Sequence, residues 1–327
     1  MKIAIFSAAT RESRSGNWVT ARRWQSLLKS VGHRVSILHD ESEVESCGST
    51  DLLIGLHARR SGKALRIFKR VNPGGATMVA LTGTDIYRDL SPSRKHQSAT
   101  ATRSLNDCDH IILLQPLMAK RLGRKWRLKS SVVLMDVPKV KAPARRRLST
   151  GTLKACVVGH MRYEKDPLRS AMAVRKLPRN VSIEVTHVGR ALTDSFQNRA
   201  DRESCQNQNW NWLGSVPFVK VQRLMRSYDV LINSSRAEGA PNVLFEAIGW
   251  RLPVIASKID GHVGILGSDY PGYFKVGDTD GLQKLLVRCA KDEAFYRQLV
   301  AAVEKLARKY RPGNELKMLR KAIVDAM

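Results

Sequence analysis

The sequence has few of the features that mark membrane-spanning or disulfide-rich proteins. Its longest apolar runs, such as His110 to Leu114, are far too short to cross a bilayer. The N-terminal segment contains a short apolar run broken by charge, which does not resemble the core of a signal peptide. The five cysteines are scattered and include no C-x-x-C pair, which argues against a disulfide framework and a structural zinc site. We therefore expect a cytoplasmic protein that begins with a β-strand.

Acidic residues are also scarce. The chain has 29 acidic and 56 basic residues, for a net charge of +27, and such a field attracts nucleic acid, anionic lipid or phosphorylated substrates. Between Lys120 and Arg147 the only acid is Asp136. No nucleic-acid-binding module accompanies this stretch, and a charge run is usually a solvated face. The local segment Lys120 to Arg127 also fits a membrane surface.

Apolar runs and helical patterns alternate along the chain. Strands are predicted at residues 2–8, 35–38, 52–56, 78–81, 111–114 and 132–135, and, after a break, at 153–158, 183–188, 211–213, 230–233 and 254–256. Ser61 is expected to cap one intervening helix, and prolines 167, 217 and 241 to open others. This alternation predicts an α/β fold with parallel sheets covered on both faces.

The segment Val137 to Thr152 is rich in proline, basic and small polar residues and has no periodicity, as is typical of a linker. We expect a first domain over residues 1–140 and a second over 141–312. Both are doubly wound, so ligands should bind at the carboxyl ends of their strands. The last helix is predicted over Asn314 to Ala326.

One stretch organises the second half: NSSRAEGAPNVLFEAIGW, residues 233–250. Glu238 falls in the loop after a strand, and Glu246 lies inside the following helix. Gly239 allows close approach of a ligand to the backbone, and the N–H groups near Asn242 and Val243 form a phosphate site. Spacing alone supports a nucleotide pocket and an ordinary βα turn equally well.

Residues 238–247 also match E-G-x-P-x-x-x-x-E-A, and on this motif the chain resembles the retaining family 4 glycosyltransferases. The resemblance implies a GT-B fold, with two Rossmann-like domains facing across a cleft, and a last helix, residues 313–327, that returns to the first domain. It also implies that Glu238 contacts the transferred sugar and Glu246 the ribose. The intervening backbone, including Ala240 and Pro241, would receive the diphosphate.

Two other strand ends depart from this family's pattern. Related enzymes place a histidine before Gly-Thr-Asp, where this chain has Thr82. They also carry G-R-L-x-x-x-K, in which Arg and Lys neutralise the departing diphosphate. Here Lys165 aligns, the arginine position is His160, and Arg162 is the candidate for the missing cation.

Two glycine-containing loops complete the expected donor site. Ser15, Gly16 and Asn17 follow the first strand and can cradle a phosphate, although an ordinary N-cap loop looks the same. Gly214 follows the predicted strand that contains Trp210 and Trp212, and by the resemblance it lies near the base. One of these tryptophans could stack on uracil, but at least one is expected in the core.

Several further segments together resemble a subfamily, the selenosugar synthases of bacterial selenoneine biosynthesis. They are residues 13–17, 56–61, 82–89, 159–167 and 264–274. The resemblance implies that a UDP-sugar, UDP-N-acetylglucosamine or UDP-glucose, receives selenium from selenophosphate. UDP and phosphate leave, and a 1-selenosugar remains. No metal and no cofactor are expected, since cations and a helix N-terminus would stabilise the leaving group.

A small, multiply charged acceptor calls for cations and hydroxyl groups in the first domain. The candidates that should face the acceptor are Arg14, His57, Arg59, Arg60, Thr82, Thr84, Asp85 and Arg88. For His57, an ordinary hydrogen-bonded histidine at a strand end fits the sequence equally well. A selenium nucleophile is already activated, so a general base is dispensable, which is consistent with Thr82 in place of histidine.

Two alternatives remain open. The basic segment near Lys120 fits a peripheral membrane glycosyltransferase with a lipid or cell-wall acceptor, although no stable membrane association is expected. A nucleic-acid-binding protein on a degenerate scaffold would also explain the charge. The intact Glu238 and Glu246 motif speaks against that reading.

Overall fold

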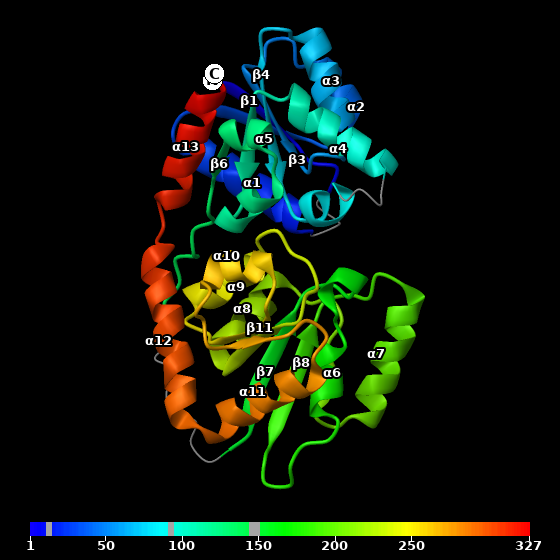
Figure 1. The fold of residues 1–327 in the computed structure, drawn as a ribbon, viewed down its shortest axis with the longest axis vertical. Coiled ribbons are helices and arrows are strands. Elements are labelled where there is room, and N and C mark those ends of the chain that lie inside the picture. Colours follow the sequence, from blue (N-terminus) through cyan, green and yellow to red (C-terminus); the bar gives the residue numbers. More distant parts are fainter. Residues whose placement is uncertain (11–14, 91–94, 144–150) are drawn as a thin grey trace. The chain divides into compact units, whose positions relative to one another are not determined.

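The computed structural model describes residues 1–10, 15–90, 95–143 and 151–327 (Figure 1). Two compact units are distinguished within it. The first contains Met1–Met135, Glu238–Pro241 and Gly313–Met327, and the second contains Asp136–Ala237 and Asn242–Pro312.

The first unit is built on a six-stranded parallel sheet in the order β2-β1-β3-β4-β5-β6. Its strands are β1 (Lys2–Phe6), β2 (Arg34–Leu38), β3 (Leu52–Leu56), β4 (Ala76–Leu81), β5 (His110–Leu113) and β6 (Ser130–Val132). Its helices are α1 (Gly16–Lys29), α2 (Glu41–Glu45), α3 (Gly62–Val71), α4 (Lys95–Asp107), α5 (Arg124–Leu128) and α13 (Asn314–Ala326), with a π-helical turn η1 (Asp85–Asp89) and a 3-10 turn η2 (Pro116–Arg121).

Alternate residues of β1 point to opposite faces of this sheet. Ile3 and Ile5 join a core with Trp24 of α1 and Leu319 of α13, whereas Ala4 and Phe6 join a second core with Phe68 of α3. The sheet is therefore covered by helices on both faces, as the continuous apolar strands predict.

The terminal helix α13 is fastened to α1 by a buried carboxylate. Glu315, 1% exposed, accepts hydrogen bonds from Trp24 Nε1 at 2.8 Å and from Arg23 Nε at 2.9 Å. Leu319 and Ile323 of the same helix are buried in the sheet's core. The last residues of the chain thus belong to the same core as the first.

The second unit has a six-stranded parallel sheet in the order β12-β11-β10-β7-β8-β9. Its strands are β7 (Leu153–Val158), β8 (Ile183–Val188), β9 (Trp210–Trp212), β10 (Val230–Asn233), β11 (Val254–Ser257) and β12 (Tyr273–Phe274). Its helices are α6 (Arg169–Val174), α7 (Asp194–Gln206), α8 (Phe218–Ser227), α9 (Asn242–Gly249), α10 (Asp260–Leu266), α11 (Thr279–Lys291) and α12 (Glu293–Lys309), and it has a 3-10 turn η3 (Tyr163–Lys165).

The predicted doubly wound, parallel α/β architecture is confirmed, and β3, β7, β8 and β10 have the predicted bounds. The strand β12 and the helices α2, α7 and α10 are additional, because their short or polar sequences lack a clear period. Ser61 is the N-cap residue of α3, as expected, but its hydroxyl donates to the carbonyl of Leu56 at 3.1 Å and makes no side-chain cap. The prolines expected to open helices lie just before them, since α6 begins at Arg169, α8 at Phe218 and α9 at Asn242.

Part of the expected linker packs on the second unit. Val137 is buried and donates its N–H to the carbonyl of Tyr310 at 2.8 Å, and Pro138 lies against Gly249. Residues 144–150 of that segment lie outside the described residues. The start of the expected linker, at Val137, is therefore buried in folded structure.

Strand order places a switch point in each sheet, where successive connections run in opposite directions. In the first unit it lies between β1 and β3, and in the second between β7 and β10. Most of the predicted site residues follow these strands or the strands beside them, so we expect the ligand-binding groups at the two switch points.

Candidate active site

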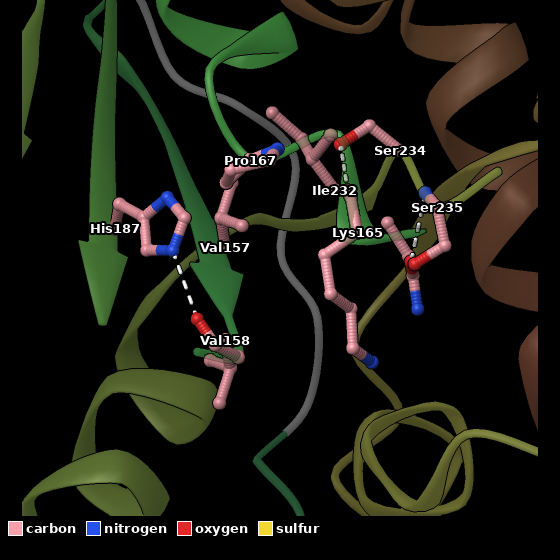
Figure 2. A pocket seen from close by; sticks show the side chains of 10 residues that line it. Val157, Val158, Lys165, Pro167, His187, Ile232, Ser234 and Ser235 are labelled. Atoms are coloured by element: carbon pink, nitrogen blue, oxygen red, sulfur yellow. Dashed lines mark hydrogen bonds between the residues drawn. The ribbon is translucent and has the colours of Figure 1, made fainter. Parts of the chain in front are cut away.

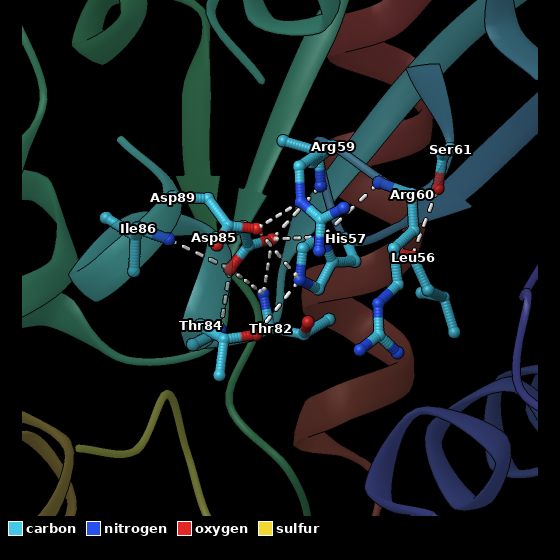
Figure 3. A network of polar contacts seen from close by, with 12 residues as sticks. Leu56, His57, Arg59, Arg60, Ser61, Thr82, Thr84, Asp85, Ile86 and Asp89 are labelled. Carbon is cyan, nitrogen blue, oxygen red and sulfur yellow. Dashed lines mark hydrogen bonds and ion pairs between the residues drawn. The ribbon is translucent and has the colours of Figure 1, made fainter. Parts of the chain in front are cut away.

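In the first unit, the segments after β3 and β4 form one polar network (Figure 3). His57, directly after β3, is 1% exposed and has a φ of 85°, which is uncommon for a residue other than glycine. Its Nε2 lies 3.0 Å from Thr84 Oγ1. The imidazole therefore holds Thr84 from within the protein and is not a surface group.

Asp85 organises the loop after β4. Its fully buried carboxylate accepts hydrogen bonds from four backbone amides, those of Ala58, Thr82, Gly83 and Ile86, at 2.8–3.1 Å. Such a carboxylate is fully used by the backbone. Asp85 was expected to face the acceptor, and the structure gives it the role of shaping the loop that presents Thr82 and Thr84.

Asp89 gathers two of the predicted arginines. Its buried carboxylate accepts from Arg59 Nε at 2.7 Å and from Arg88 Nε at 3.1 Å, and His57 Nε2 lies 3.7 Å away. Burial alone would raise the pKa of Asp89, but the hydrogen bonds from Arg59 and Arg88 lower it. Asp89 was not among the predicted site residues, and its only signal was its place at the end of the Gly-Thr-Asp segment.

The charge of this network is smaller than the sequence indicates. Burial lowers the pKa of His57, against the opposing effect of Asp85 and Asp89, so the imidazole is neutral near pH 7. The segments then carry the positive charges of Arg59, Arg60 and Arg88 against the two negative charges of Asp85 and Asp89. The side chains of Arg59 and Arg88 remain about one-third exposed, and Arg60 is exposed. An excess of positive charge thus remains at the surface of the network.

Two other predicted residues follow β1. Gly16 is the first residue of α1, whose N-cap Ser15 accepts a hydrogen bond from the N–H of Trp18 at 3.5 Å. Arg14 lies outside the described residues. The capped start of α1 supports the N-cap interpretation of this loop.

In the second unit, a small pocket lies where β7 and β10 end (Figure 2). It is lined by Gly159 and Lys165 from one segment, by Asn233, Ser234 and Ser235 from the other, and by His187 of β8. The Lys165 side chain runs along Gly159, because a Cβ atom added to that glycine would lie 3.8 Å from Lys165 Cε. The predicted cation is therefore at the switch point of the sheet.

His187 supports this pocket from behind. It is 1% exposed, and its Nε2 lies 3.0 Å from the carbonyl oxygen of Gly159. Burial lowers the pKa of His187 to about 4, so the neutral ring donates that hydrogen bond. Gly189, with φ 144°, has no room for a side chain, since a Cβ would lie 2.0 Å from the same carbonyl. The backbone of Gly159 is thus held by two neighbours.

The two candidate replacements for the family's arginine occupy different places. His160 is half-buried, and its Nδ1 accepts from the N–H of Arg190 at 3.2 Å. Arg162 is half-buried and precedes η3, with its carbonyl bonded to the N–H of Lys165 at 3.0 Å. Neither residue lines the pocket that Lys165 lines.

The signature segment consists of a loop followed by the start of a helix, as the motif predicts. Asn242 and Val243 form the first turn of α9, whose leading N–H groups have no partner within the helix, and Glu246 is half-buried one turn later. Glu238, Gly239, Ala240 and Pro241 form the preceding loop, which groups with the first unit.

The end of β9 also carries a predicted residue. Gly214, with φ 62°, has nothing within 4 Å of an added Cβ, and its carbonyl accepts from the N–H of Gly189 at 2.8 Å. Trp210 is buried, as expected for one tryptophan of the pair, and Trp212 Nε1 donates to the carbonyl of Gly189 at 2.7 Å. These contacts hold the two glycines side by side.

Comparison with known proteins gives a consistent result. Residues 140–307, just over half of the chain, match the family described as glycosyl transferases group 1. A relative in Xenopus tropicalis, glycosyltransferase 1 domain-containing protein 1, is 23% identical over 294 residues, which cover 83% of each chain.

Solved structures show the same fold across nearly the whole chain. HepE of Anabaena, in complex with UDP and glucose, is 14% identical with a TM-score of 0.75, covering 99% of both chains. Sucrose-phosphate synthase of Thermosynechococcus elongatus is 13% identical with a TM-score of 0.80, covering 99% of this chain and 98% of that one. The expected GT-B fold is confirmed.

Proposed function

The chain belongs to the glycosyl transferases group 1, and we propose that it transfers a sugar from a UDP-sugar to selenophosphate. The solved relative with the same fold that holds UDP and glucose supports a UDP-sugar donor. UDP-N-acetylglucosamine and UDP-glucose are the donors that the sequence resemblance favours. The second unit then supplies Lys165 and the first-turn amides of α9 to the diphosphate, and Glu246 to the ribose.

The observation that carries the acceptor is the arginine network of the first unit. Asp89 holds Arg59 and Arg88 through their Nε atoms, and both side chains remain about one-third exposed. Arg60 adds an exposed cation, and Thr82 and Thr84 add hydroxyl groups on the same rigid loop. Planar guanidinium groups and hydroxyl groups suit a small phosphate-like anion, whereas an uncharged alcohol gains nothing from them.

The chemistry balances without a cofactor. Selenium of selenophosphate attacks the anomeric carbon, the bond from that carbon to the UDP oxygen breaks, and UDP leaves with the electron pair. Water then hydrolyses the Se–P bond, which gives phosphate and the 1-selenosugar. Lys165 and the α9 amides stabilise the charge on the departing UDP. Because selenium is already a strong nucleophile, no general base is required, and His57 remains an internal, neutral group.

A direct assay tests this proposal. Purified protein is incubated with each UDP-sugar, with and without fresh selenophosphate, while UDP release is measured and the sugar product is examined for selenium by mass spectrometry. We expect selenophosphate-dependent release and a selenium-bearing sugar. Arg60→Met should raise the KM for selenophosphate about tenfold. An arginine substitution that weakens UDP-sugar binding but leaves the KM for selenophosphate unchanged contradicts the acceptor site.

A second candidate rests on the exposed segment near α5. Leu128 is 79% exposed and follows the exposed basic residues Arg124, Lys125 and Arg127. This combination suits an anionic membrane surface and a lipid or cell-wall acceptor. Lys129 does not contribute, because its Nζ binds the carbonyls of Asn106 and Cys108. Among the described residues, no helix is long and apolar enough to cross a membrane. Co-sedimentation with anionic liposomes, together with transfer to an alcohol acceptor, would favour this alternative.

A further inference from the structure

The two strands at the switch point of the second unit carry segments that bind each other closely. After β7, residues Tyr163, Glu164, Lys165 and Asp166 form a tight turn, here called the lysine turn. After β10, the chain passes through Ser234 and Arg236 before it reaches Glu238. More than sixty residues separate the two segments, and the adjacent positions of β7 and β10 bring them together.

Each residue of the lysine turn receives a contact from Ser234 or Arg236. The N–H of Arg236 donates to the carbonyl of Glu164 at 2.8 Å. The buried hydroxyl of Ser234 lies 3.2 Å from the carbonyl of Lys165 (Figure 2). It also lies 2.9 Å from the carbonyl of Asp166, as a shared donor.

The side chain of Arg236 completes the set. Its Nη2 lies 3.4 Å from Asp166 Oδ2, and its Cζ lies 5.2 Å from the ring centre of Tyr163, which is itself 70% exposed. A guanidinium group over an aromatic face and beside a carboxylate gains from both contacts. The Arg236 side chain therefore contacts the first and the last residue of the turn.

The turn needs such support because its backbone is strained. Asp166 has φ 45° and ψ 55°, in the left-handed region that glycine adopts freely and that aspartate and asparagine adopt at a lower cost than other residues. Its carboxylate also accepts from Arg169 Nε at 3.0 Å, and Arg169 Nη1 donates to Thr279 Oγ1 at 2.6 Å. Two arginines on different segments thus hold the residue next to Lys165.

We propose that Arg236 and Ser234 are positioning residues that aim Lys165 at the departing diphosphate. This inference rests on the proposed role of Lys165 in the transfer. Lysine carries its charge on a flexible four-carbon chain, so its place depends on the backbone from which it starts. Displacement of a catalytic group by about 1 Å can lower a rate about 100-fold. The contacts of Ser234 and Arg236 fix that starting point, two residues before the signature glutamate.

A double-mutant cycle tests the coupling. The variants are Lys165→Met, Arg236→Met and the combination, with kcat and KM measured for UDP-N-acetylglucosamine and selenophosphate. Arg236→Met keeps an unbranched apolar side chain and the backbone N–H, and removes the guanidinium group with its contacts to Tyr163 and Asp166. We expect kcat to fall about 10- to 100-fold with a small change in donor KM. In the Lys165→Met background the same substitution should cost less than about threefold. Arg236→Lys should recover part of kcat.

Arg288→Met is the matched control. Arg288 also pairs with a carboxylate, Asp292, at 3.0 Å, and lies over an aromatic ring, Phe295, at 4.1 Å, but far along the chain from the lysine turn. Its kcat should match that of the wild type. If Arg236→Met does not fold, Asp166→Asn serves instead, because asparagine tolerates the left-handed backbone while losing the charge.

The outcomes separate this inference from the proposed function. Strictly additive effects, or an Arg236→Met enzyme as active as Arg288→Met, overturn the inference alone. An unchanged kcat in Lys165→Met overturns both the inference and the role of Lys165. If selenophosphate is not an acceptor, the same cycle is measured as UDP affinity by titration calorimetry. There, loss of affinity that is coupled between Arg236 and Lys165 supports the inference, and independent effects overturn it.

Discussion

The loop after β4 in the first unit and the loop after β7 in the second are both held by an aspartate that binds arginines, but their cations have different roles. Each contains a glycine at positive φ, Gly83 at 126° and Gly159 at 156°, and an aspartate that binds two arginines. Asp89 binds Arg59 and Arg88, and Asp166 binds Arg169 and Arg236. In both, the aspartate shapes a loop that carries ligand-directed groups.

The difference lies in which cation is directed to the ligand. In the first unit the arginines that anchor the loop are also the proposed acceptor contacts. In the second, Arg169 and Arg236 anchor the turn while Lys165 is the proposed contact. In the first loop, the same arginines support the backbone and would bind the anion. In the second loop, the arginines support the backbone and a different residue, Lys165, would bind the ligand. Substitution of an arginine in the first loop should therefore change both loop stability and acceptor KM. In the second loop, substitution of an arginine should change kcat and leave acceptor KM almost unchanged.

The largest expected difference is in stability. Asp85→Ala leaves four backbone amides of the first loop without their acceptor, and each lost bond costs about 1 kcal/mol, so we expect a loss of about 3–5 kcal/mol. Asp166→Asn keeps an oxygen that can accept from the arginines and should cost about 1–2 kcal/mol. Urea unfolding measures both, and hydrogen exchange localises them to residues 76–90 or 153–168. Equal losses would show that the loops are supported alike.

Lowering the pH should reduce the unfolding free energy more through His187, which supports the second loop, than through His57 in the first. Burial lowers the pKa of His187 from 6.5 to about 4, so the unfolded chain binds more protons in that window. The unfolding free energy therefore decreases as the pH falls from 6.5 to 4, by about 3 kcal/mol from this residue. The pKa of His57 is also lowered by burial, but Asp85 and Asp89 oppose the shift, so its contribution has the same sign and is smaller.

The variants His187→Gln and His57→Asn test this difference in unfolding experiments across the pH range. Glutamine keeps a donor for the carbonyl of Gly159, and asparagine tolerates the positive φ of residue 57. The acid-dependent loss should shrink more in His187→Gln. A pH profile that neither variant changes would contradict the assignment of buried, neutral histidines.

The kinetic effects of the two anchors should separate. Arg59→Met removes a loop anchor and an acceptor contact together, so we expect the KM for selenophosphate to rise about 10- to 30-fold. Arg169→Met removes only an anchor of the lysine turn, and that KM should change less than about twofold, while kcat falls. Steady-state kinetics with selenophosphate as the varied substrate measures both. A similar rise in KM for Arg169→Met would mean that the acceptor also depends on the second loop.

The smallest expected effect is that of salt. The exposed parts of Arg59, Arg60 and Arg88 attract an anion through solvent, so the KM for selenophosphate should rise about two- to fourfold between 50 and 300 mM salt. The effect of Arg236→Met on kcat should not depend on salt, because that residue acts through close contacts. Initial rates at several ionic strengths check both statements. A KM independent of salt would contradict steering by these arginines.

Much of the fold follows from local patterns. Short apolar runs with turn residues on either side predicted β3, β7, β8 and β10 to the residue, because buried parallel strands need continuous apolar sequence. Short amphipathic or polar helices such as α2 and α7 escaped, since their period is weak. Ser61 is the N-cap residue of α3, as expected, but its hydroxyl donates to the carbonyl of Leu56 and its oxygen makes no capping bond, an orientation that no local rule indicates.

The site was predictable in its kinds of residue and less so in their roles. The strand-end residues His57, Asp85 and Arg88 were expected to face the acceptor. Burial turned His57 and Asp85 into internal supports, and it brought in Asp89 as the partner of two arginines. Exposure is a property of packing, so a side chain's type and place in a loop do not determine it.

The sequence by itself determined that the chain is α/β, that it carries the signature from Glu238 to Ala247, and that cations gather after its strands. Only the tertiary structure decided which cation each carboxylate binds. Asp166 meets Arg236 because β7 lies beside β10, and Asp89 meets Arg59 because β4 lies beside β3. Strand order is set by how whole helices and sheets pack, and that packing brings together residues that the sequence leaves far apart.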